Sequence, residues 1–360
     1  MRPRAIVGHG NFLGLLCATA AGMALSRFLN FHPRAEQEEP CQNQPEAPAL
    51  SPGRTIKVVT YNTQFLAGTN YDFFYDGGTD SLVNPADVLK TAAGISAFLT
   101  RENPDFILLQ EVDCGARRTA YLDQIELLMN LLPKELRNYA NTYYWKSRFV
   151  PHPKIMGPAG TKLAIFSRYR LGKAMRYRLA HTPANPVVKD FHFKRAILQV
   201  DVPLTDGKTF CLLNTHLEAF PKGTRIMKRQ VDQILSRLDF LDQKGLPWLI
   251  GGDFNLLPPA QWTRLNIEQR GCHHHPSEIS AIYQRYHGVP MIADASEEQM
   301  RRFMTFTKRI GSDRTPIRTL DYFFASPQTK IRRYAVRQEG VKHLSDHLPL
   351  VAEFSLPHPA

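Results

Sequence analysis

The sequence lacks the cysteine spacing of a zinc ribbon or of a thioredoxin-type redox site. No C-x-x-C pair occurs, and both kinds of site depend on that pair. The five cysteines stand far apart along the chain, at Cys17, Cys41, Cys114, Cys211 and Cys272. A cysteine-based zinc or redox site is therefore not predicted.

Long blocks of like charge are absent as well. The chain carries 45 lysines and arginines and 33 acidic residues, for a formal net charge of +12, but the basic residues are scattered. A basic surface suits an anionic partner such as nucleic acid or acidic lipid. Scattered positive charge is equally typical of an ordinary solvated surface, so both interpretations stay open.

Internal repeats and linker-like breaks are absent from Arg54 onward. The chain has 360 residues, of which 43% are apolar, which is enough for a large core. One α/β domain over residues 54–360 is therefore predicted rather than two.

The N-terminal residues have a composition that is not typical of a folded domain. Arg2 and Arg4 precede an apolar run from Phe12 to Leu25, which is as long as a signal-peptide core and short for a membrane span. Residues 1–31 are interpreted as a signal peptide or an N-terminal membrane anchor, with a buried amphipathic helix as the alternative. The protein is then exported, to the periplasm or the extracellular space, or it is membrane-anchored. The polar, proline-rich residues 32–53 predict a flexible linker.

Strands and helices alternate in the predicted domain. Runs of β-branched and other apolar residues predict strands, and apolar residues at helical spacing predict helices. Strands are expected at 55–62, 105–112, 162–168, 195–202, 209–216, 247–253, 319–326, 331–336 and 348–356, and helices at 85–99, 121–132 and 227–241.

Polar side chains stand where many of these strands begin or end. Catalytic groups often lie on one edge of a rigid sheet, so we expect these side chains to converge. They are Asn62, Glu111, His216, Asp253, Asn255, Asp321, Asp346 and His347.

This set of side chains favours metal-assisted chemistry on phosphates. Hard oxygen ligands without cysteine favour Mg²⁺ or Mn²⁺ over Zn²⁺, and such an ion neutralises phosphate charge. An aspartate–histidine pair can activate water. In the stretch "GGDFNLLPP" (251–259), the two glycines are expected to let the substrate approach closely, and the two prolines to stiffen the turn.

The chain resembles the endonuclease/exonuclease/phosphatase superfamily. The stretches "TYNTQ", "LLQEV", "NTHLEA", "GGDFN", "LDYFFAS" and "SDHLPL" occur in the right order between residues 60 and 350. The resemblance implies an α/β fold, a four-layer α/β/β/α sandwich with two mixed β-sheets packed face to face. It also implies Mg²⁺-dependent hydrolysis of a phosphoester by in-line attack of water.

The same resemblance implies a metal site. Glu111 matches the main Mg²⁺ ligand, with Asn62 beside it, and Asp346 assists the metal or the site geometry.

The resemblance also implies roles in catalysis and phosphate binding. Asp253 would orient or activate the water, and Asn255 would bind a phosphate oxygen. His347 would act as general base or stabilise the phosphate, oriented by Asp321 through its other ring nitrogen. His216 matches the histidine of the deoxyribonuclease and sphingomyelinase branches. From its place at a strand start, Arg195 is a candidate for phosphate contact, and a solvated position is the alternative.

Two departures from related branches limit the substrate. Gln64 stands where apurinic endonucleases have an acidic residue, and His216 replaces their asparagine, so abasic-site repair is not favoured. The chain has "LIGGDFN" (249–255) where inositol-phosphatases usually have "WxGDxN", so that branch is not favoured either.

Aromatic and basic residues are interleaved in two segments, 65–78 and 143–162. They could stack bases, insert at a membrane surface, or pack beneath the sheet edge. A nuclease-like phosphodiesterase is the first interpretation, and a lipid-headgroup phosphodiesterase of the sphingomyelinase or phosphoinositide type is the alternative. An inactive binding module is disfavoured because no catalytic position is lost. The expected partner is an anionic phosphoester, nucleic acid or phospholipid, with possible membrane association through the N-terminus and no obligate protein partner.

Overall fold

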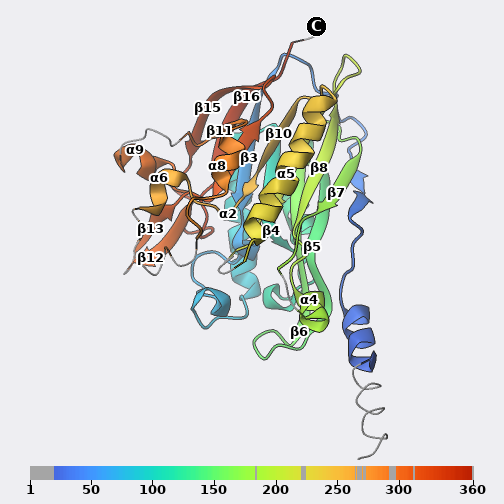
Figure 1. Cartoon of the computed structure of the whole chain (residues 1–360), viewed down its shortest axis with the longest axis vertical. Coiled ribbons are helices and arrows are strands. Elements are labelled where there is room, and N and C mark those ends of the chain that lie inside the picture. The colour runs from blue at the N-terminus through green and yellow to red at the C-terminus, as the bar shows by residue number, and fades with distance from the viewer. Residues whose placement is uncertain are drawn as a thin grey trace, which may run out of the picture.

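Two seven-stranded sheets form the centre of the protein in a computed structural model of the chain (Figure 1). The structure describes residues 20–182, 185–219, 224–263, 265, 270, 273–291, 297–310 and 313–358. Residues 1–19, which include the first part of the apolar run from Phe12 to Leu25, lie outside the described residues, so the signal peptide or anchor stays a prediction.

The first sheet has the strand order β1-β7-β8-β9-β10-β14-β11. Its strands are β1 (Glu36–Glu39), β7 (Ala174–Arg178), β8 (Ala196–Pro203), β9 (Thr209–His216), β10 (Trp248–Asp253), β14 (Asp321–Ala325) and β11 (His287–Val289). The β9–β10 pair is parallel and the other pairs are antiparallel, so the sheet is mixed, as predicted.

The second sheet has the order β15-β16-β3-β4-β6-β5-β2. Its strands are β15 (Lys330–Val336), β16 (Leu350–Ser355), β3 (Thr55–Asn62), β4 (Phe106–Asp113), β6 (Gly157–Ser167), β5 (Asn138–Val150) and β2 (Cys41–Gln42), and a separate hairpin joins β12 (Phe306–Ile310) to β13 (Asp313–Arg318). Only β3 and β4 run parallel among the pairs of this sheet. The long β5 and the start of β6 occupy the segment 143–162, one of the two segments in which aromatic and basic residues are interleaved.

Helices cover the outer faces of the two sheets. They are α2 (Pro85–Glu102), α3 (Gln124–Leu131), α4 (Pro186–Phe191), α5 (Ile226–Gln243), α6 (Pro259–Trp262), α8 (Ile279–Tyr283) and α9 (Glu297–Arg302), with short 3-10 turns η1 (Gln64–Leu66), η2 (Phe74–Asp76), η3 (Arg117–Thr119) and η4 (Lys134–Leu136). Successive residues of β14 point to opposite faces. Phe324 packs in the cluster of α5, and Phe323 packs in the core of the second sheet. The four-layer α/β/β/α sandwich is therefore confirmed.

The predicted linker, residues 32–53, is largely part of the fold. Strand β1 pairs with β7 at the edge of the first sheet, and β2 pairs with β5 at the edge of the second. The structure thus differs from the prediction of a flexible segment, because backbone pairing at two open sheet edges orders a stretch whose composition is that of a linker. Residues 20–29 form a helix before these strands. Among the described residues, no helix is long and apolar enough to cross a membrane.

The two glycines of "GGDFN" serve packing, which corrects the expectation that they admit substrate. A Cβ on Gly251 would lie 2.4 Å from the Phe323 ring, and a Cβ on Gly252 would lie 2.0 Å from the carbonyl oxygen of Thr215. Gly252 also has a φ of +148°, a backbone conformation that residues with a side chain rarely adopt. The glycines therefore let β10 pack closely between its neighbours, and this packing aims Asp253 at the sheet edge.

Candidate active site

Strand register brings the predicted site residues to one edge of the sandwich. In the first sheet, Asp253 on β10 pairs with His216 on β9 and with Asp321 on β14. In the second sheet, Asn62 ends β3 beside β4, which carries Glu111. Since β3, β4, β9 and β10 all end at this edge, residues far apart in sequence meet there.

Asp253 stands at the centre of the group. Its Oδ2 accepts a hydrogen bond of 3.0 Å from Asn62 Nδ2, which joins the two sheets. The same oxygen lies 3.5 Å from Nε2 of His216 and 3.5 Å from Nε2 of His347. Its Oδ1 accepts from the backbone N–H of Asn255 at 2.9 Å. A buried carboxylate thus lies between two imidazoles.

His347 and Asp321 form a buried pair, as predicted. Nδ1 of His347 lies 2.8 Å from Oδ2 of Asp321, and both residues are almost fully buried. The ring of Phe306 packs edge-on against the imidazole at 5.2 Å. The pair therefore fixes the ring so that Nε2 points to Asp253.

Charges around His347 favour its protonated form. Burial alone would lower the pKa of His347, but Asp321 and Asp253 outweigh it and raise that pKa well above its usual value. Burial raises the pKa of Asp253 to about 6, although His347 opposes the shift. Burial and the nearby Arg195 lower the pKa of His216 far below its usual value. The site thus combines a cationic His347 with a neutral His216.

Glu111 and Asp346 form a second carboxylate group in the same cleft. Glu111 adopts a φ of 58° where the pairing of β4 with β6 shifts register, a local irregularity that re-aims the side chain. Burial, followed by the charge of Asp346, raises the pKa of Glu111 to about 8, and burial also raises the pKa of Asp346.

This second group fits a divalent cation. Two neighbouring, half-buried carboxylates repel each other unless a cation or protons neutralise them. The amide of Asn62 stands beside them and supplies a further oxygen, Oδ1. An all-oxygen donor set suits Mg²⁺ or Mn²⁺. Asp253, Asp321 and His347 also have ligand atoms within 4.8 Å of one another, but the hydrogen bond from His347 to Asp321 already accounts for that arrangement.

Arg195 is buried near His216, and its Nη2 lies 3.9 Å from a carboxylate oxygen of Glu218. Its side chain is only 4% exposed, and its Nε and Nη1 atoms are buried without a hydrogen-bond partner among the described residues. The guanidinium lies 5.0 Å from the ring of Tyr144, which itself packs against His216. A buried guanidinium with free donors beside the catalytic histidine suits an anionic substrate.

Asn255 follows β10 with a φ of 52°, and its Nδ2 donates to the carbonyl oxygen of Leu217. This contact holds the side chain at the edge of the cleft. The eight strand-end residues predicted to converge therefore lie at one edge of the sandwich, with Arg195 on the His216 side.

Several supporting residues were not singled out from the sequence. Gln110 donates to Asn214 at 2.7 Å, and Asn214 donates to the carbonyl oxygens of Leu109 and Ala164, so a buried polar network ties the sheets together beneath the cleft. In the sequence, Gln110 and Asn214 each stand as a polar residue within an apolar run, "LLQEV" and "LLNTH", and this pattern could have indicated them. Gln64, noted only as a departure, accepts from the Asp346 N–H and donates through its own N–H to Asn62.

The two aromatic segments are mostly packed inside. Phe73 is buried within a set of stacked rings, and Trp145 packs against Phe193 and donates to the Phe191 carbonyl. Tyr75 and Phe149 are exceptions, at 41% and 37% exposed. The electrostatic influence of Glu111 on Tyr75 places this ring near the cleft.

A family model described as "Endonuclease/Exonuclease/phosphatase family" matches residues 59–347. The chain belongs to this family. Members of the endonuclease/exonuclease/phosphatase family hydrolyse phosphoesters and generally use a divalent metal ion, so the predicted family and the enzyme class are confirmed. No curated protein matches the chain by sequence.

Solved structures of other family members share the fold. An endonuclease/exonuclease/phosphatase from Beutenbergia cavernae is 21% identical, with a TM-score of 0.58, over 84% of this chain and 72% of that one. The human Nocturnin catalytic domain with bound sulfate is 19% identical, with a TM-score of 0.54, over 86% and 96%. A mannosyl-6-phosphatase from Bacteroides thetaiotaomicron is 18% identical, with a TM-score of 0.50, over 84% and 100%. These likenesses concern the fold and leave the substrate of this chain to its own residues.

Proposed function

We propose that this chain is a Mg²⁺-dependent phosphodiester hydrolase in which water attacks phosphorus in line. The observation that carries the proposal is the position of Asp253 Oδ2, 3.5 Å from Nε2 of both His216 and His347. A carboxylate between two imidazoles supplies a proton acceptor and two donors within one cleft.

Glu111, Asp346 and Asn62 are the residues that would hold the metal ion. When bound, Mg²⁺ would neutralise phosphate charge and stabilise the leaving oxygen. Mn²⁺ suits the same oxygen ligands.

The protein side chains divide the remaining work. The Asp253 carboxylate orients the attacking water and accepts its proton. Protonated His347, held by Asp321, stabilises the negative charge that develops on the phosphate oxygens. His216 is neutral, and its Nε2 faces the carboxylates of Asp253 and Glu111, at 3.5 and 3.9 Å, so this nitrogen carries the hydrogen and can donate a hydrogen bond to a substrate oxygen.

Arg195 and Asn255 complete the phosphate-binding side of the cleft. Arg195 contributes the two unpartnered nitrogens described above.

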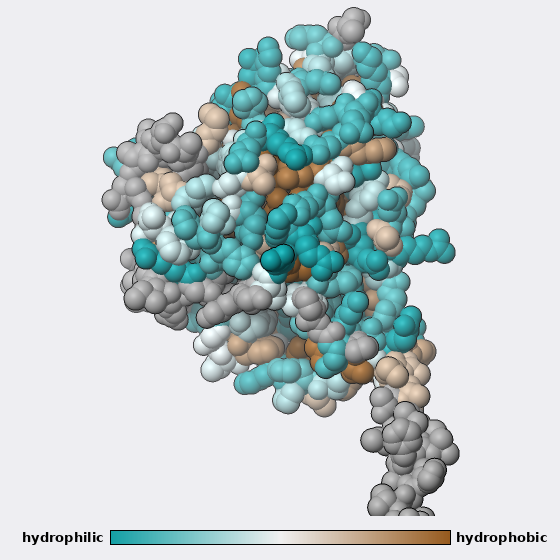
Figure 2. Space-filling view, in the orientation of Figure 1, coloured by the Kyte–Doolittle hydropathy of each residue, from teal (hydrophilic) through white to brown (hydrophobic). Residues whose placement is uncertain are grey.

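The phosphodiester of a membrane lipid is the substrate class that the geometry favours. The segments predicted to stack bases are mostly packed inside the protein, whereas exposed apolar side chains gather at the catalytic edge. Phe149 and Met156 lie at the ends of the β5–β6 hairpin, and Val187 and Val188 lie on α4. Figure 2 shows apolar surface at this lower end of the molecule.

Nucleic acid is the second candidate. The formal net charge of +12 and the exposed ring of Tyr75 beside the cleft support it.

Parallel hydrolysis assays test the proposal. The full chain is incubated with Mg²⁺ or with EDTA and offered sphingomyelin vesicles, phosphatidylinositol vesicles, plasmid, single-stranded DNA and RNA. The expected result is Mg²⁺-dependent headgroup release that His347→Ala reduces by at least about 10²-fold. His343→Ala, the same change at an exposed histidine four residues earlier, should keep full activity.

Two results would change the conclusion. Mg²⁺-dependent cleavage of nucleic acid with intact lipid would select the second candidate. Turnover of neither class, in a protein that still binds Mg²⁺, would overturn phosphodiester hydrolysis for these substrates.

A further inference from the structure

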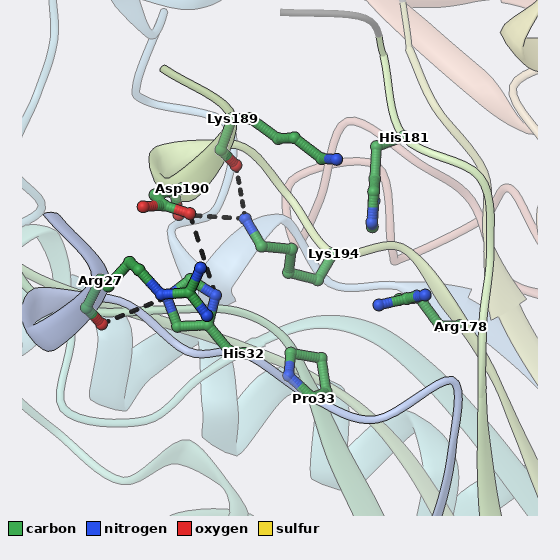
Figure 3. A pocket seen from close by; sticks show the side chains of 8 residues that line it. All are labelled: Arg27, His32, Pro33, Arg178, His181, Lys189, Asp190 and Lys194. Carbon is green, nitrogen blue, oxygen red and sulfur yellow. Dashed lines mark hydrogen bonds and ion pairs between the residues drawn. The ribbon is translucent and has the colours of Figure 1, made fainter. Parts of the chain in front are cut away.

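A cationic cavity lies beside the catalytic cleft but outside it (Figure 3). Its volume is about 420 Å³, and its lining comes from the helix at residues 20–29, the end of β7 and α4. Arg178 pairs with Ala196, and the next residue of β8, Ile197, pairs with Thr215. Since Thr215 precedes His216, the cavity opens at the catalytic edge of the first sheet.

Positive charge in this cavity is not neutralised by the described residues. Arg27, Arg178 and Lys189 have no carboxylate partner among the residues that the structure describes. Figure 3 shows Arg178, His181 and Lys189 around a common space. The single lining carboxylate, Asp190, is engaged by Ser26 at 2.8 Å and by the nearby His32.

Two further residues set the chemistry of the cavity. Lys194 donates to the carbonyl oxygens of Lys189, Asp190 and His192 at the end of α4, so it anchors that helix. His181 has a buried Nδ1 without a partner among the described residues. Burial and the surrounding cations, Lys194 first, lower the pKa of His181 to about 4. An anion entering this space would therefore meet unneutralised positive charge and an open nitrogen.

Apolar side chains flank the cavity on the same two helices. Leu25 and Phe28 are 57% and 63% exposed on the N-terminal helix, and Val187 and Val188 are exposed on α4. The hydrogen bond from Ser26 to Asp190 joins the two helices. Cations next to exposed apolar side chains form the amphipathic arrangement that binds at a bilayer interface.

We propose that this surface docks the enzyme on an anionic phospholipid bilayer. Headgroup phosphates occupy the cavity of Arg27, Arg178 and Lys189, while Leu25, Phe28, Val187 and Val188 enter the boundary between headgroups and acyl chains. A lipid fits better than nucleic acid because three of the four flanking side chains, Leu25, Val187 and Val188, are aliphatic and cannot stack on bases.

This docking places the catalytic cleft at the lipid surface. Lys194 lines the cavity, and the next residue, Arg195, lies beside His216. The inference goes beyond the proposed function, because it concerns where the enzyme binds and holds for either substrate class.

Vesicle co-sedimentation tests the docking. The full chain carrying His347→Ala, which prevents turnover, is mixed with phosphatidylglycerol vesicles or with phosphatidylcholine vesicles. Tighter binding to phosphatidylglycerol is expected, and the double variant Arg178→Gln/Lys189→Gln should lose about 30-fold in that affinity. The control Lys90→Gln/Lys330→Gln removes the same charge from exposed positions outside the cavity and should retain it.

A second variant tests the apolar part. Leu25→Ser/Phe28→Ser should weaken binding to both kinds of vesicle, and its melting temperature should match that of the parent because both side chains are exposed. Unchanged phosphatidylglycerol affinity in the Arg178/Lys189 variant would overturn the proposal. So would a loss of single-stranded DNA binding in that variant with vesicle binding intact, which would assign the cavity to nucleic acid.

Hydrolysis of a water-soluble diester, bis-p-nitrophenyl phosphate, separates docking from catalysis. With the native His347, the Arg178→Gln/Lys189→Gln variant should hydrolyse it at the parent rate. Loss of docking with this rate unchanged would therefore support the docking and leave the proposed function intact. Absence of bis-p-nitrophenyl phosphate hydrolysis in the parent, with phosphatidylglycerol binding retained, would count against the proposed function alone.

Discussion

Replacing Asp321 with asparagine isolates the charge behind His347. The side chain keeps its size, and its amide oxygen can still accept a hydrogen bond from Nδ1 of His347. In the native protein this nitrogen lies 2.8 Å from the Asp321 carboxylate. The substitution therefore removes a negative charge while the imidazole stays in place.

The expected loss follows from the distance between the charges. Opposite charges about 4 Å apart, at an effective dielectric constant of about 20, attract by about 4 kcal/mol. Each 1.4 kcal/mol is tenfold in rate, so complete loss of this attraction would correspond to about 10³-fold. Asp253 still faces the other ring nitrogen of His347, at 3.5 Å, and retains part of the stabilisation. We therefore expect kcat to fall by about 10²-fold to 10³-fold.

The assay is steady-state hydrolysis of bis-p-nitrophenyl phosphate at saturating Mg²⁺, with a thermal melt of the same sample. The Mg²⁺ concentration for half-maximal activity should not change, because Asp321 is bonded to His347 and is not among the proposed metal ligands. Asp201→Asn, the same substitution near the far end of β8, is the matched control. A fall in kcat of less than tenfold would refute the role of the pair, and a large shift in Mg²⁺ dependence would make Asp321 a metal ligand instead.

Three other perturbations test the metal site and the fold. Glu111→Gln should weaken Mg²⁺ binding by at least about 100-fold, measured as the loss of Mg²⁺-dependent thermal stabilisation, and unchanged binding would exclude Glu111 as a ligand. Gly252→Ala should destabilise the fold by about 3 kcal/mol or more, because the added Cβ meets backbone at a positive φ. Gly340→Ala, at a φ of 71° in open space, should cost only about 1 kcal/mol, and equal melting temperatures for the two variants would contradict the packing argument. Removing residues 1–43 deletes β1 and β2 and should lower the melting temperature relative to removal of residues 1–19, and equal temperatures would show that the edge strands contribute nothing.

The local elements could be predicted because their patterns are short-range. Strand β3 coincides with the predicted 55–62 and β9 with 209–216, since β-branched and apolar runs report burial directly. The residues at the strand ends were also visible, because a carboxylate or imidazole at the end of an apolar run is unusual. The order of these motifs along the chain was sufficient to identify the family.

Predictions from composition were wrong where contacts between distant segments determined the structure. Residues 32–53 have the composition of a linker, but open sheet edges recruit them as β1 and β2. The aromatic residues of segment 65–78 have the composition of a binding loop, but Phe73 is internal. The glycines before Asp253 favour substrate approach as a motif, but the neighbouring strands fill that space.

By itself, the sequence determined which kinds of side chain were present for catalysis and, through their spacing, at which strand ends they would stand. Tertiary structure alone decided which atoms meet. It placed Asp253 between His216 and His347, and it gathered Arg27, Arg178 and Lys189 around one cavity. The physical reason is that periodicity records the environment of each residue along its own strand or helix, whereas contacts between distant segments depend on sheet register and on the packing of the two sheets.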